Sequence, residues 1–516
     1  MPTPAKSLFD RIPDGLVLTV IVIAAFSIRI YHIAHLSLWF DETVTFVKSH
    51  VDLPSLWISP TENKPPLYYT IVKTFLFLGD SEFILRLPSA LAGTISVALG
   101  YLIGKTLGGR REGFIISILF LLHDVNIQYS QEARHYIFLI VGLELSIFGL
   151  LRLLISRREA SNSKRLIVSS TFIISGNIIS IYSHTVAIVY LFVIHATIVS
   201  YLLFFRDFNR LKPLLAANLI SIILGVPWFL TLFQLTIHGD PNFEWLQQPT
   251  PSESFELFRG VLGARFSWLP VSITTTLLLL AALLGAAALI RAGQRNIAIT
   301  LTAGLFATPI LLWIVGLETP IYMFRTLAPL HIYSCVLTGS ALSRLQSNTA
   351  RFALTTVIIA IFAKSTVGYE AAFTKTDWRS AIQYAEDQLN ADGVIVICQQ
   401  HRYAPLSYYL STDIPVLSVG STNDVSIMTR ERHRRAVSMS VSGDTDLDEA
   451  YPLLTEEFVK RIGSACVISI GDECGSNTGG LVTIASRLGL DFASGIQHEF
   501  SHGSHLRVNC YATLTR

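Results

Sequence analysis

Long apolar segments alternate with short polar connections over the first 370 residues, and this alternation constrains the fold more than any other feature. About 20 consecutive apolar residues are needed for a helix to cross a membrane. Only 15% of the residues are charged, against about a quarter in soluble domains. The sequence therefore predicts a polytopic α-helical membrane protein. Its approximately eleven spans are expected at 14–34, 86–106, 112–124, 135–155, 165–182, 185–205, 213–235, 270–290, 297–316, 325–343 and 352–369.

Two of the predicted spans need comment. The segment 112–124 is short for a full crossing, so we expect it to begin in the preceding connection or to continue past Asp124 as a kinked helix. The first span follows Lys6 and Arg11 and has no small-residue cleavage site before Trp39, which predicts an uncleaved anchor.

Every second connection is rich in Lys and Arg, as in the stretch from Lys105 to Arg111. Basic connections lie in the cytoplasm. The pattern predicts an inner (plasma) membrane protein with a cytoplasmic N-terminus, and an odd number of crossings then places the C-terminal part outside. Because the basic residues are spread over many connections and form no single patch, a nucleic-acid partner is excluded.

The composition changes after residue 370, where charged runs appear. We therefore expect two domains: a transmembrane domain over 1–369, with a long outer loop at 36–85, and a soluble extracytoplasmic domain over 370–516. β-Branched runs at 394–398, 466–470 and 481–484 predict strands, and 378–389 predicts an amphipathic helix. The tail is thus expected to be a small α/β domain.

Four of the five cysteines lie in this tail: Cys398, Cys466, Cys474 and Cys510. In an oxidising compartment they permit two disulfides in any of three pairings. The alternative is that all four are buried thiols. No two of them are two to four residues apart, which argues against a zinc site.

The acidic pair Asp41-Glu42 lies just past the first span, at the water edge of the membrane. Ionisable groups near a bilayer are costly and are often functional, so we interpret the pair as a candidate catalytic site. The alternative is a solvated loop or a helix cap. Further along the same outer loop, Pro65-Pro66 can open a helix over 67–78 that is too short to cross and is expected to lie on the membrane surface. Lys64 would stand at its start, either near a lipid phosphate or as a plain interfacial lysine.

Other polar residues gather in the connections on the same side. The stretch 123–136 carries Asp124, Gln131, Glu132 and Arg134, which we interpret as a pocket wall with Arg134 facing an anionic substrate; a salt bridge between Arg134 and Glu132 is the alternative. Arg325 opens a span and suits a phosphate, because its planar fork holds two oxygens, although it also fits a simple interfacial anchor. Tyr182 and His184 complete the candidate pocket, where His184 can equally be structural.

Several motifs together resemble a known family. The segments Leu38-Trp-Phe-Asp-Glu42, Lys64-Pro-Pro-Leu-Tyr-Tyr69, 86–93 and 129–136 are similar to those of bacterial GT-C glycosyltransferases, such as protein O-mannosyltransferases and lipid A aminoarabinose transferases. The resemblance covers approximately residues 10–370. In the tail, Asp377-Trp-Arg379 and Tyr408-Tyr409-Leu410 also resemble the family. Two departures are Lys64, where the family often has His, and Tyr182-Ser-His-Thr185, which lacks a final aromatic ring.

The resemblance implies an inverting glycosyltransferase that moves a sugar from a polyprenyl monophosphate to an acceptor at the outer membrane face. The acceptor would be a protein, a glycolipid or a glycan. Asp41 matches the family's proposed catalytic base and Glu42 its neighbour, while Lys64, Arg134 and Arg325 are the candidates for the donor phosphate. A divalent cation, Mg or Mn, held by Asp41 and Asp124 is left open, as is the absence of any cofactor.

Two other classes of protein fit the sequence less well. A transporter or flippase of lipid-linked glycans would favour charges in the middle of spans, yet Glu144 is almost the only carboxylate placed there. A non-catalytic receptor would leave the polar loops at 36–85 and 125–134 without a purpose. Glycosyl transfer is therefore the preferred interpretation.

Overall fold

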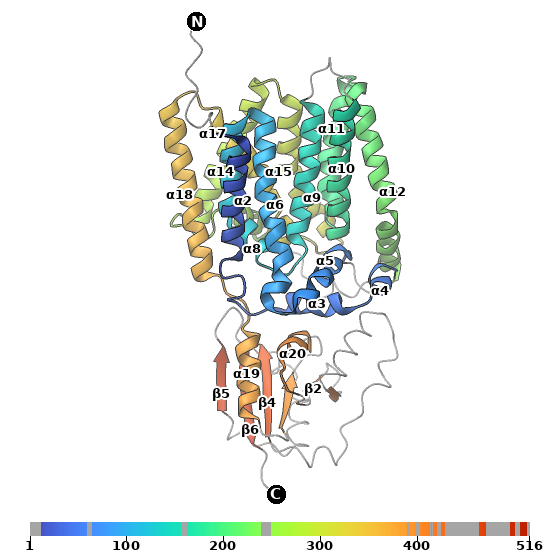
Figure 1. The fold of residues 1–516 in the computed structure, drawn as a ribbon, viewed down its shortest axis with the longest axis vertical. Coiled ribbons are helices and arrows are strands. Elements are labelled where there is room, and N and C mark those ends of the chain that lie inside the picture. Colours follow the sequence, from blue (N-terminus) through green and yellow to red (C-terminus); the bar gives the residue numbers. More distant parts are fainter. Residues whose placement is uncertain are drawn as a thin grey trace. The chain divides into compact units, whose positions relative to one another are not determined.

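The computed structural model describes residues 12–58, 64–155, 163–238, 249–389, 393–397, 403–412, 414, 416–419, 425–428, 464–470, 496–500 and 506–512. The chain forms two compact units, coloured along the sequence in Figure 1. The first comprises Met1–Tyr31, Glu62–Tyr68 and Arg86–Phe373, and the second comprises His32–Thr61, Tyr69–Leu85 and Thr374–Arg516.

The first unit is a bundle of helices (Figure 1). Its helices are α2 (Asp14–Ile30), α6 (Glu82–Gly108, which begins in the second unit), α7 (Arg110–Leu122), α8 (Asp124–Ser130), α9 (Tyr136–Leu154), α10 (Ser163–Ser183), α11 (Ala187–Phe204), α12 (Phe208–His238), α13 (Pro251–Leu262), α14 (Val271–Arg291), α15 (Arg295–Gly316), α16 (Phe324–Leu327), α17 (Leu330–Ser343) and α18 (Asn348–Ala372).

Eight of the described helices are long and apolar enough to cross a membrane: α6, α9, α10, α11, α12, α14, α15 and α18. Each of them overlaps a span expected from the sequence. The expected spans at 14–34 and 325–343 correspond to shorter helices, since α2 has 17 residues and α17 has 14. An integral membrane protein is thus confirmed, whereas the count of eleven spans stays a prediction.

The expected span at 112–124 is instead part of a bent helix pair, which would add a ninth span if it crosses as one. Helices α7 and α8 meet at 62°. The backbone of His123 leaves the helical region between them, with ψ at 119°, and its Nδ1 accepts a hydrogen bond from the backbone N–H of Val125 at 3.3 Å. A side chain that caps the first turn of α8 in this way starts a new helix in place of continuing the old one. The kinked helix expected to continue past Asp124 is therefore present, and its bend lies at His123.

Helices α9 and α10 pack through small residues. A Cβ atom at Gly142 would lie 2.7 Å from the backbone nitrogen of Ser180, and one at Gly176 would lie 2.4 Å from that of Ser146. Only glycine permits backbones to approach so closely, as in other membrane helix pairs.

A chain of buried polar side chains links four helices inside the bundle. Arg29 of α2 donates to Asn126 of α8 at 2.7 Å, and Asn126 donates to Ser96 of α6 at 2.8 Å. Ser96 in turn donates to Glu144 of α9 at 2.7 Å. The carboxylate in the middle of a span, which a transporter would use for its cargo, is thus part of an internal network here.

The second unit combines short helices with a sheet (Figure 1). Its helices are α3 (Phe40–His50), α4 (Leu53–Ile58), α5 (Leu67–Phe75, which begins in the first unit), the 3₁₀ helix η1 (Leu76–Leu78), α19 (Trp378–Gln388) and α20 (Tyr403–Tyr409). Its strands are β1 (Gly393–Ile397), β2 (Val416–Val419), β3 (Val425–Met428), β4 (Ser464–Ile470), β5 (Ile496–Phe500) and β6 (Leu506–Ala512).

The six strands form one mixed sheet in the order β3-β2-β1-β4-β6-β5. Strand β1 pairs in parallel with β2 and β4, while the other pairs are antiparallel. Trp378, Ile382 and Ala385 of α19 are buried against Ile395 of β1 and Val508 of β6 in a small apolar core. Strands β1 and β4 cover the runs expected at 394–398 and 466–470, whereas the run at 481–484 lies outside the described residues.

One disulfide joins two adjacent strands of this sheet. Cys466 of β4 and Cys510 of β6 are directly opposite each other in the antiparallel register and are bonded. This is one of the pairings that the sequence permitted, and it excludes the alternative of four free thiols. Cys398 and Cys474 lie outside the described residues.

Candidate active site

The acidic pair lies in the first turn of α3, where a negative charge is favoured by the helix dipole. The two carboxylates have different surroundings. Asp41 is partly exposed, whereas Glu42 is fully buried and accepts a hydrogen bond from the backbone N–H of Trp39 at 3.3 Å. Of the two, only Asp41 therefore reaches the molecular surface.

A buried lysine faces Glu42. Lys375 Nζ lies 3.0 Å from Glu42 Oε2, and both side chains are almost completely enclosed. A buried charge needs such a partner, because water does not solvate it. Lys375 is 333 residues away in sequence, and no local motif predicts the pairing.

Segments after residue 374 also hold the chain that leads into α3. Ser37 Oγ donates to the carbonyl of Thr376 at 2.7 Å, and the backbone N–H of Leu38 donates to the hydroxyl of Tyr409 at 2.5 Å. Tyr409 in turn donates to Glu82. The entrance to α3 is therefore fixed by residues distant in sequence.

Arg379 adds a second tie to the same region. It forms an ion pair with Glu82 and donates to the carbonyl of Ala34 at 3.2 Å. Burial lowers the pKa of Arg379, but the charge and hydrogen bond of Glu82 and the contact with Tyr409 together outweigh burial, and the net shift is upward. The motifs Asp377-Trp-Arg379 and Tyr408-Tyr409-Leu410, noted in the sequence, thus contribute Arg379 and Tyr409 to the support of the loop that carries Asp41.

In the first unit, the three predicted phosphate-binding cations all influence the pKa of one imidazole. Burial, followed by the charges of Arg325, Arg134 and Lys64, lowers the pKa of His184 to about 3. The same three cations lower the pKa of His135, again after burial. A charge shifts a pKa only over a short range, so each of the three cations lies within electrostatic range of both rings. The structure therefore gathers Lys64, Arg134 and Arg325 around His135 and His184.

The rings of this cluster are packed together. The His135 and His184 ring centroids are 4.8 Å apart, and Tyr136 lies 5.5 Å from His184. The Arg134 guanidinium is 5.9 Å from the centre of the Tyr136 ring. His184 Nδ1 accepts a hydrogen bond from the backbone N–H of Val186 at 3.2 Å, so in the neutral ring Nε2 carries the proton. The cluster thus offers positive charge and neutral hydrogen-bond donors, both suited to an anion.

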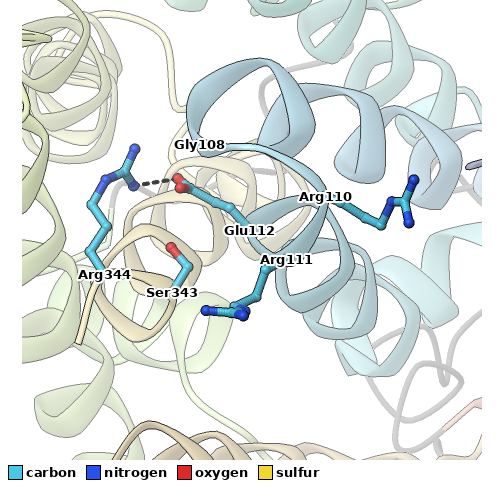
Figure 2. Close-up of a pocket in the computed structure, with 6 residues that line it drawn as sticks. All are labelled: Gly108, Arg110, Arg111, Glu112, Ser343 and Arg344. Carbon is cyan, nitrogen blue, oxygen red and sulfur yellow. Dashed lines mark hydrogen bonds and ion pairs between the residues drawn. The ribbon is translucent and has the colours of Figure 1, made fainter. Parts of the chain in front are cut away.

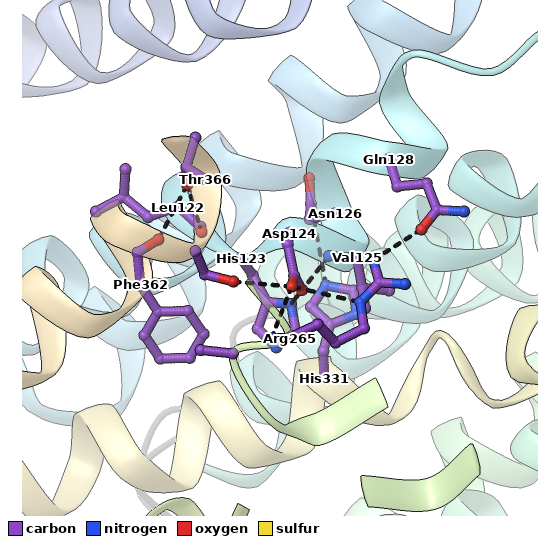
Figure 3. A network of polar contacts seen from close by, with 12 residues as sticks. Leu122, His123, Asp124, Val125, Asn126, Gln128, Arg265, His331, Phe362 and Thr366 are labelled. Carbon is purple, nitrogen blue, oxygen red and sulfur yellow. Dashed lines mark hydrogen bonds and ion pairs between the residues drawn. The ribbon is translucent and has the colours of Figure 1, made fainter. Parts of the chain in front are cut away.

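Asp124 occupies a polar network at the break between α7 and α8 (Figure 3). Its Oδ2 accepts hydrogen bonds from the backbone N–H of Arg265 at 3.1 Å and from Ser365 Oγ at 2.9 Å. The Arg265 guanidinium lies 3.4 Å from the same oxygen and donates to Gln128 at 2.8 Å. Asp124 therefore anchors the segment after α13 to α8 and α18.

Sequence reasoning missed Arg265. The guanidinium of Arg265 lies 4.5 Å from the centre of the Phe324 ring. Phe324 directly precedes Arg325 in the sequence. This places a fourth cation beside the cluster. The long connection at 236–269 contains one other arginine or lysine, Arg259, and no recognisable motif surrounds Arg265, so the sequence offered no specific signal.

The remaining predicted pocket residues have defined contacts. Gln131 donates to the carbonyl of Tyr31 at 2.8 Å, and Glu132 accepts from Gln128 at 3.1 Å. Tyr182 donates to the carbonyl of Leu224 at 2.8 Å, which ties α10 to α12. These three side chains therefore support the bundle as well as bordering the polar region.

The described residues contain no group of three or more His, Cys, Asp or Glu side chains that could hold a metal ion. The two carboxylates considered as metal ligands are Asp41 and Asp124. The Oδ2 atom of Asp124 is already occupied by Arg265 and Ser365.

Comparison with solved structures identifies the class to which this fold belongs. The chain is similar to ArnT from Cupriavidus metallidurans in the apo state, with a TM-score of 0.59 and 15% identity over 96% of this chain and 98% of that chain. ArnT bound to undecaprenyl phosphate gives the same TM-score at 14% identity. The oligosaccharyltransferase AglB from Archaeoglobus fulgidus, in complex with an inhibitory peptide and a dolichol-phosphate, gives a TM-score of 0.52 at 11% identity, over 96% of this chain and 74% of that chain. The fold is that of the GT-C glycosyltransferases.

A family model built from sequences also matches part of the chain. Residues 23–241 match the model of the dolichyl-phosphate-mannose-protein mannosyltransferase family. No curated protein is matched by the sequence. The fold predicted from the resemblance to GT-C enzymes is thereby confirmed.

Proposed function

We propose that this protein is an inverting glycosyltransferase that uses a polyprenyl-monophosphate-linked sugar as donor. The observation that carries the proposal is the packed cluster of His135, His184 and Arg134, which Lys64 and Arg325 also influence electrostatically. A cluster of cations and neutral donors suits a phosphate. The similar structures of ArnT and AglB were obtained with undecaprenyl phosphate and dolichol-phosphate bound, which supports a lipid-linked donor here.

The cations assist the departure of the leaving group. When the sugar is transferred, its bond to the phosphate breaks and the phosphate monoester gains negative charge. Lys64, Arg134 and Arg325 stabilise that charge, with Arg265 as a fourth contributor. In a site partly screened from water such charges act more strongly than in solution.

Asp41 takes the proton of the acceptor as the acceptor attacks the anomeric carbon. Attack from the face opposite the phosphate inverts the anomeric configuration in one displacement. General base assistance of this kind contributes about 10²–10⁴ in rate. Glu42, first considered catalytic with Asp41, is buried against Lys375 and is assigned to the positioning of α3.

The remaining assignments rest on the sequence. The protein lies in the inner membrane with a cytoplasmic N-terminus, and transfer takes place on the outer face. Residues 1–369 form the catalytic membrane domain, and 370–516 form an extracytoplasmic α/β domain. The acceptor is a protein, a glycolipid or a glycan.

The proposal is tested with purified full-length protein in lipid nanodiscs and a donor labelled in the sugar. Release of polyprenyl phosphate, with the label transferred to an acceptor or to water, supports glycosyl transfer. A parallel assay in proteoliposomes follows the donor between leaflets. Movement of the intact donor without cleavage would show a flippase instead.

A further inference from the structure

A polar cavity lies in the first unit where α6 and α17 end and α7 begins (Figure 2). Its volume is about 240 Å³, and it is lined by Gly108, Arg110, Arg111, Glu112, Ser343 and Arg344. The cavity is at the first turn of α7, whereas the Asp124 network follows the last turn. A helix of 13 residues separates these two points by roughly 20 Å. The cavity is therefore distinct from the proposed donor site.

Two of the lining arginines are held by carboxylates. Arg344 Nη1 lies 2.5 Å from Glu112 Oε1, and Arg110 Nε lies 2.7 Å from Asp14 Oδ1. Arg111 is exposed and makes no ion pair or hydrogen bond with the part of the chain that the structure describes. In Figure 2 Arg111 and Arg344 lie on two sides of Ser343, whereas Arg110 extends the other way. The lining thus carries more positive than negative charge.

Hydrogen bonds and an ion pair among the lining residues hold the wall of the cavity in place. Glu112 also accepts from Ser340 Oγ at 2.5 Å, and Arg344 Nη2 donates to the carbonyl of Leu107 at 3.3 Å. A Cβ atom at Gly108 would lie 1.9 Å from Glu112 Oε2, so the paired side chains use the space that a larger residue would fill. Arg344 is therefore held in one orientation, and Arg111 is left to complete the contact with a ligand.

We propose that this cavity binds a phosphate anion, presented as the headgroup of an anionic phospholipid or as free phosphate. The planar guanidinium groups of Arg111 and Arg344 match phosphate oxygens, and the Ser343 hydroxyl adds a neutral donor. Phe114 is 36% exposed and is three residues from Arg111 on α7, so both lie on one helix face. A lipid with its phosphate in the cavity would pass its acyl chain along Phe114.

Native mass spectrometry of the full-length protein in detergent tests this site. The probes are phosphatidylglycerol and, separately, inorganic phosphate, with phosphatidylcholine as the zwitterionic comparison. The variant Arg111→Gln keeps the fixed wall, and Arg291→Gln serves as the control because Arg291 is an exposed arginine outside the cavity. We expect Arg111→Gln to bind phosphatidylglycerol about fivefold more weakly than the wild type, and Arg291→Gln to bind it normally.

The two ligand sources give different results. If Arg111→Gln loses phosphatidylglycerol binding, and excess inorganic phosphate does not compete with phosphatidylglycerol for the wild type, the site binds a lipid headgroup. Competition by inorganic phosphate, weakened in Arg111→Gln, assigns it to the free anion. The proposal would be overturned if the wild type, Arg111→Gln and Arg291→Gln all bound phosphatidylglycerol with the same affinity and all bound inorganic phosphate with the same affinity. Donor cleavage by Arg111→Gln is expected to stay at the wild-type rate, which verifies that the variant is folded.

Discussion

Lys375 Nζ lies 3.0 Å from Glu42 Oε2, and this buried ion pair connects the residue beside Asp41 with the segment that leads into α19. The pair gives the C-terminal segment a role in the arrangement of α3. Four further hydrogen bonds, made by Thr376, Arg379 and Tyr409, hold the same region. The orientation of the proposed catalytic base thus depends on residues more than 330 positions away.

Removal of one partner of this pair is predicted to be costly. Lys375→Met leaves the Glu42 charge buried and unpaired, which should destabilise the protein by about 3–5 kcal/mol. The double variant Glu42→Gln/Lys375→Met removes both charges and should recover most of that loss. Thermal unfolding in detergent measures both effects. If the single variant were as stable as the double variant, the pair would have no structural role.

The phosphate-binding cations make a second prediction. Arg134→Gln and Arg325→Gln each remove a charged donor and should weaken donor binding about 10- to 100-fold. The exposed Lys212 provides a control, since Lys212→Gln lowers the net charge by the same amount outside the cluster. Donor affinity is read from titration of the purified variants. An equal effect of all three substitutions would indicate a general charge effect and no specific site.

A third prediction concerns Asp124. Asp124→Asn weakens the contacts to Arg265 and Ser365, and we expect a loss of about 1–3 kcal/mol in the free energy of unfolding. Ser365→Ala removes a single neutral hydrogen bond and should cost about 1 kcal/mol. If Arg265 also contacts the donor, Asp124→Asn should raise the dissociation constant while Ser365→Ala leaves it nearly unchanged. Identical donor affinities in both variants would restrict Asp124 to a structural role.

The histidine cluster predicts a direction for the pH dependence of stability. His184 has a pKa of about 3 in the folded state, below its ordinary value of 6.5. Between these values the unfolded chain binds a proton that the folded protein does not, so stability falls as the pH drops from 6.5 towards 3. One such proton is worth at most about 1.4 kcal/mol per pH unit.

His184→Gln removes this contribution. Its melting temperature should therefore fall less than that of the wild type between pH 7.5 and pH 5.5. The exposed His50 offers a matched control, and His50→Gln should follow the wild-type slope. A wild-type slope in His184→Gln as well would contradict the assignment of His184 as a buried neutral ring.

Much of the fold follows from local sequence patterns. Long apolar segments predicted the positions of the eight membrane-length helices, and β-branched runs predicted β1 and β4. These elements are predictable because each is specified by its own local composition. The sequence predicted a kinked helix in this region but not the residue at which it bends, since the cause is a side-chain cap at His123. Segment 112–124 alone does not reveal that Asp124 pairs with Arg265.

The candidate site likewise combines residues that the sequence predicted with residues that it did not. Lys64, Arg134 and Arg325 were predicted because each stands at the polar end of an apolar segment, and the structure brings them to the same two histidines. Lys375 and Arg265 were missed because their partners are distant in sequence and only the tertiary fold joins them. Glu42 resembled Asp41 in sequence, and only its burial separates the two roles.

The central claim is that Asp41 is the proton acceptor of a glycosyl transfer from a polyprenyl phosphate. The most direct measurement is the rate at which purified Asp41→Asn releases polyprenyl phosphate from a saturating labelled donor, alongside donor affinity. Asp80→Asn is the control, because Asp80 is exposed and contributes its backbone carbonyl to Tyr408. The account predicts a rate about 10²–10⁴ lower in Asp41→Asn with donor affinity preserved, and a normal rate in Asp80→Asn. Release by Asp41→Asn at the wild-type rate would contradict it.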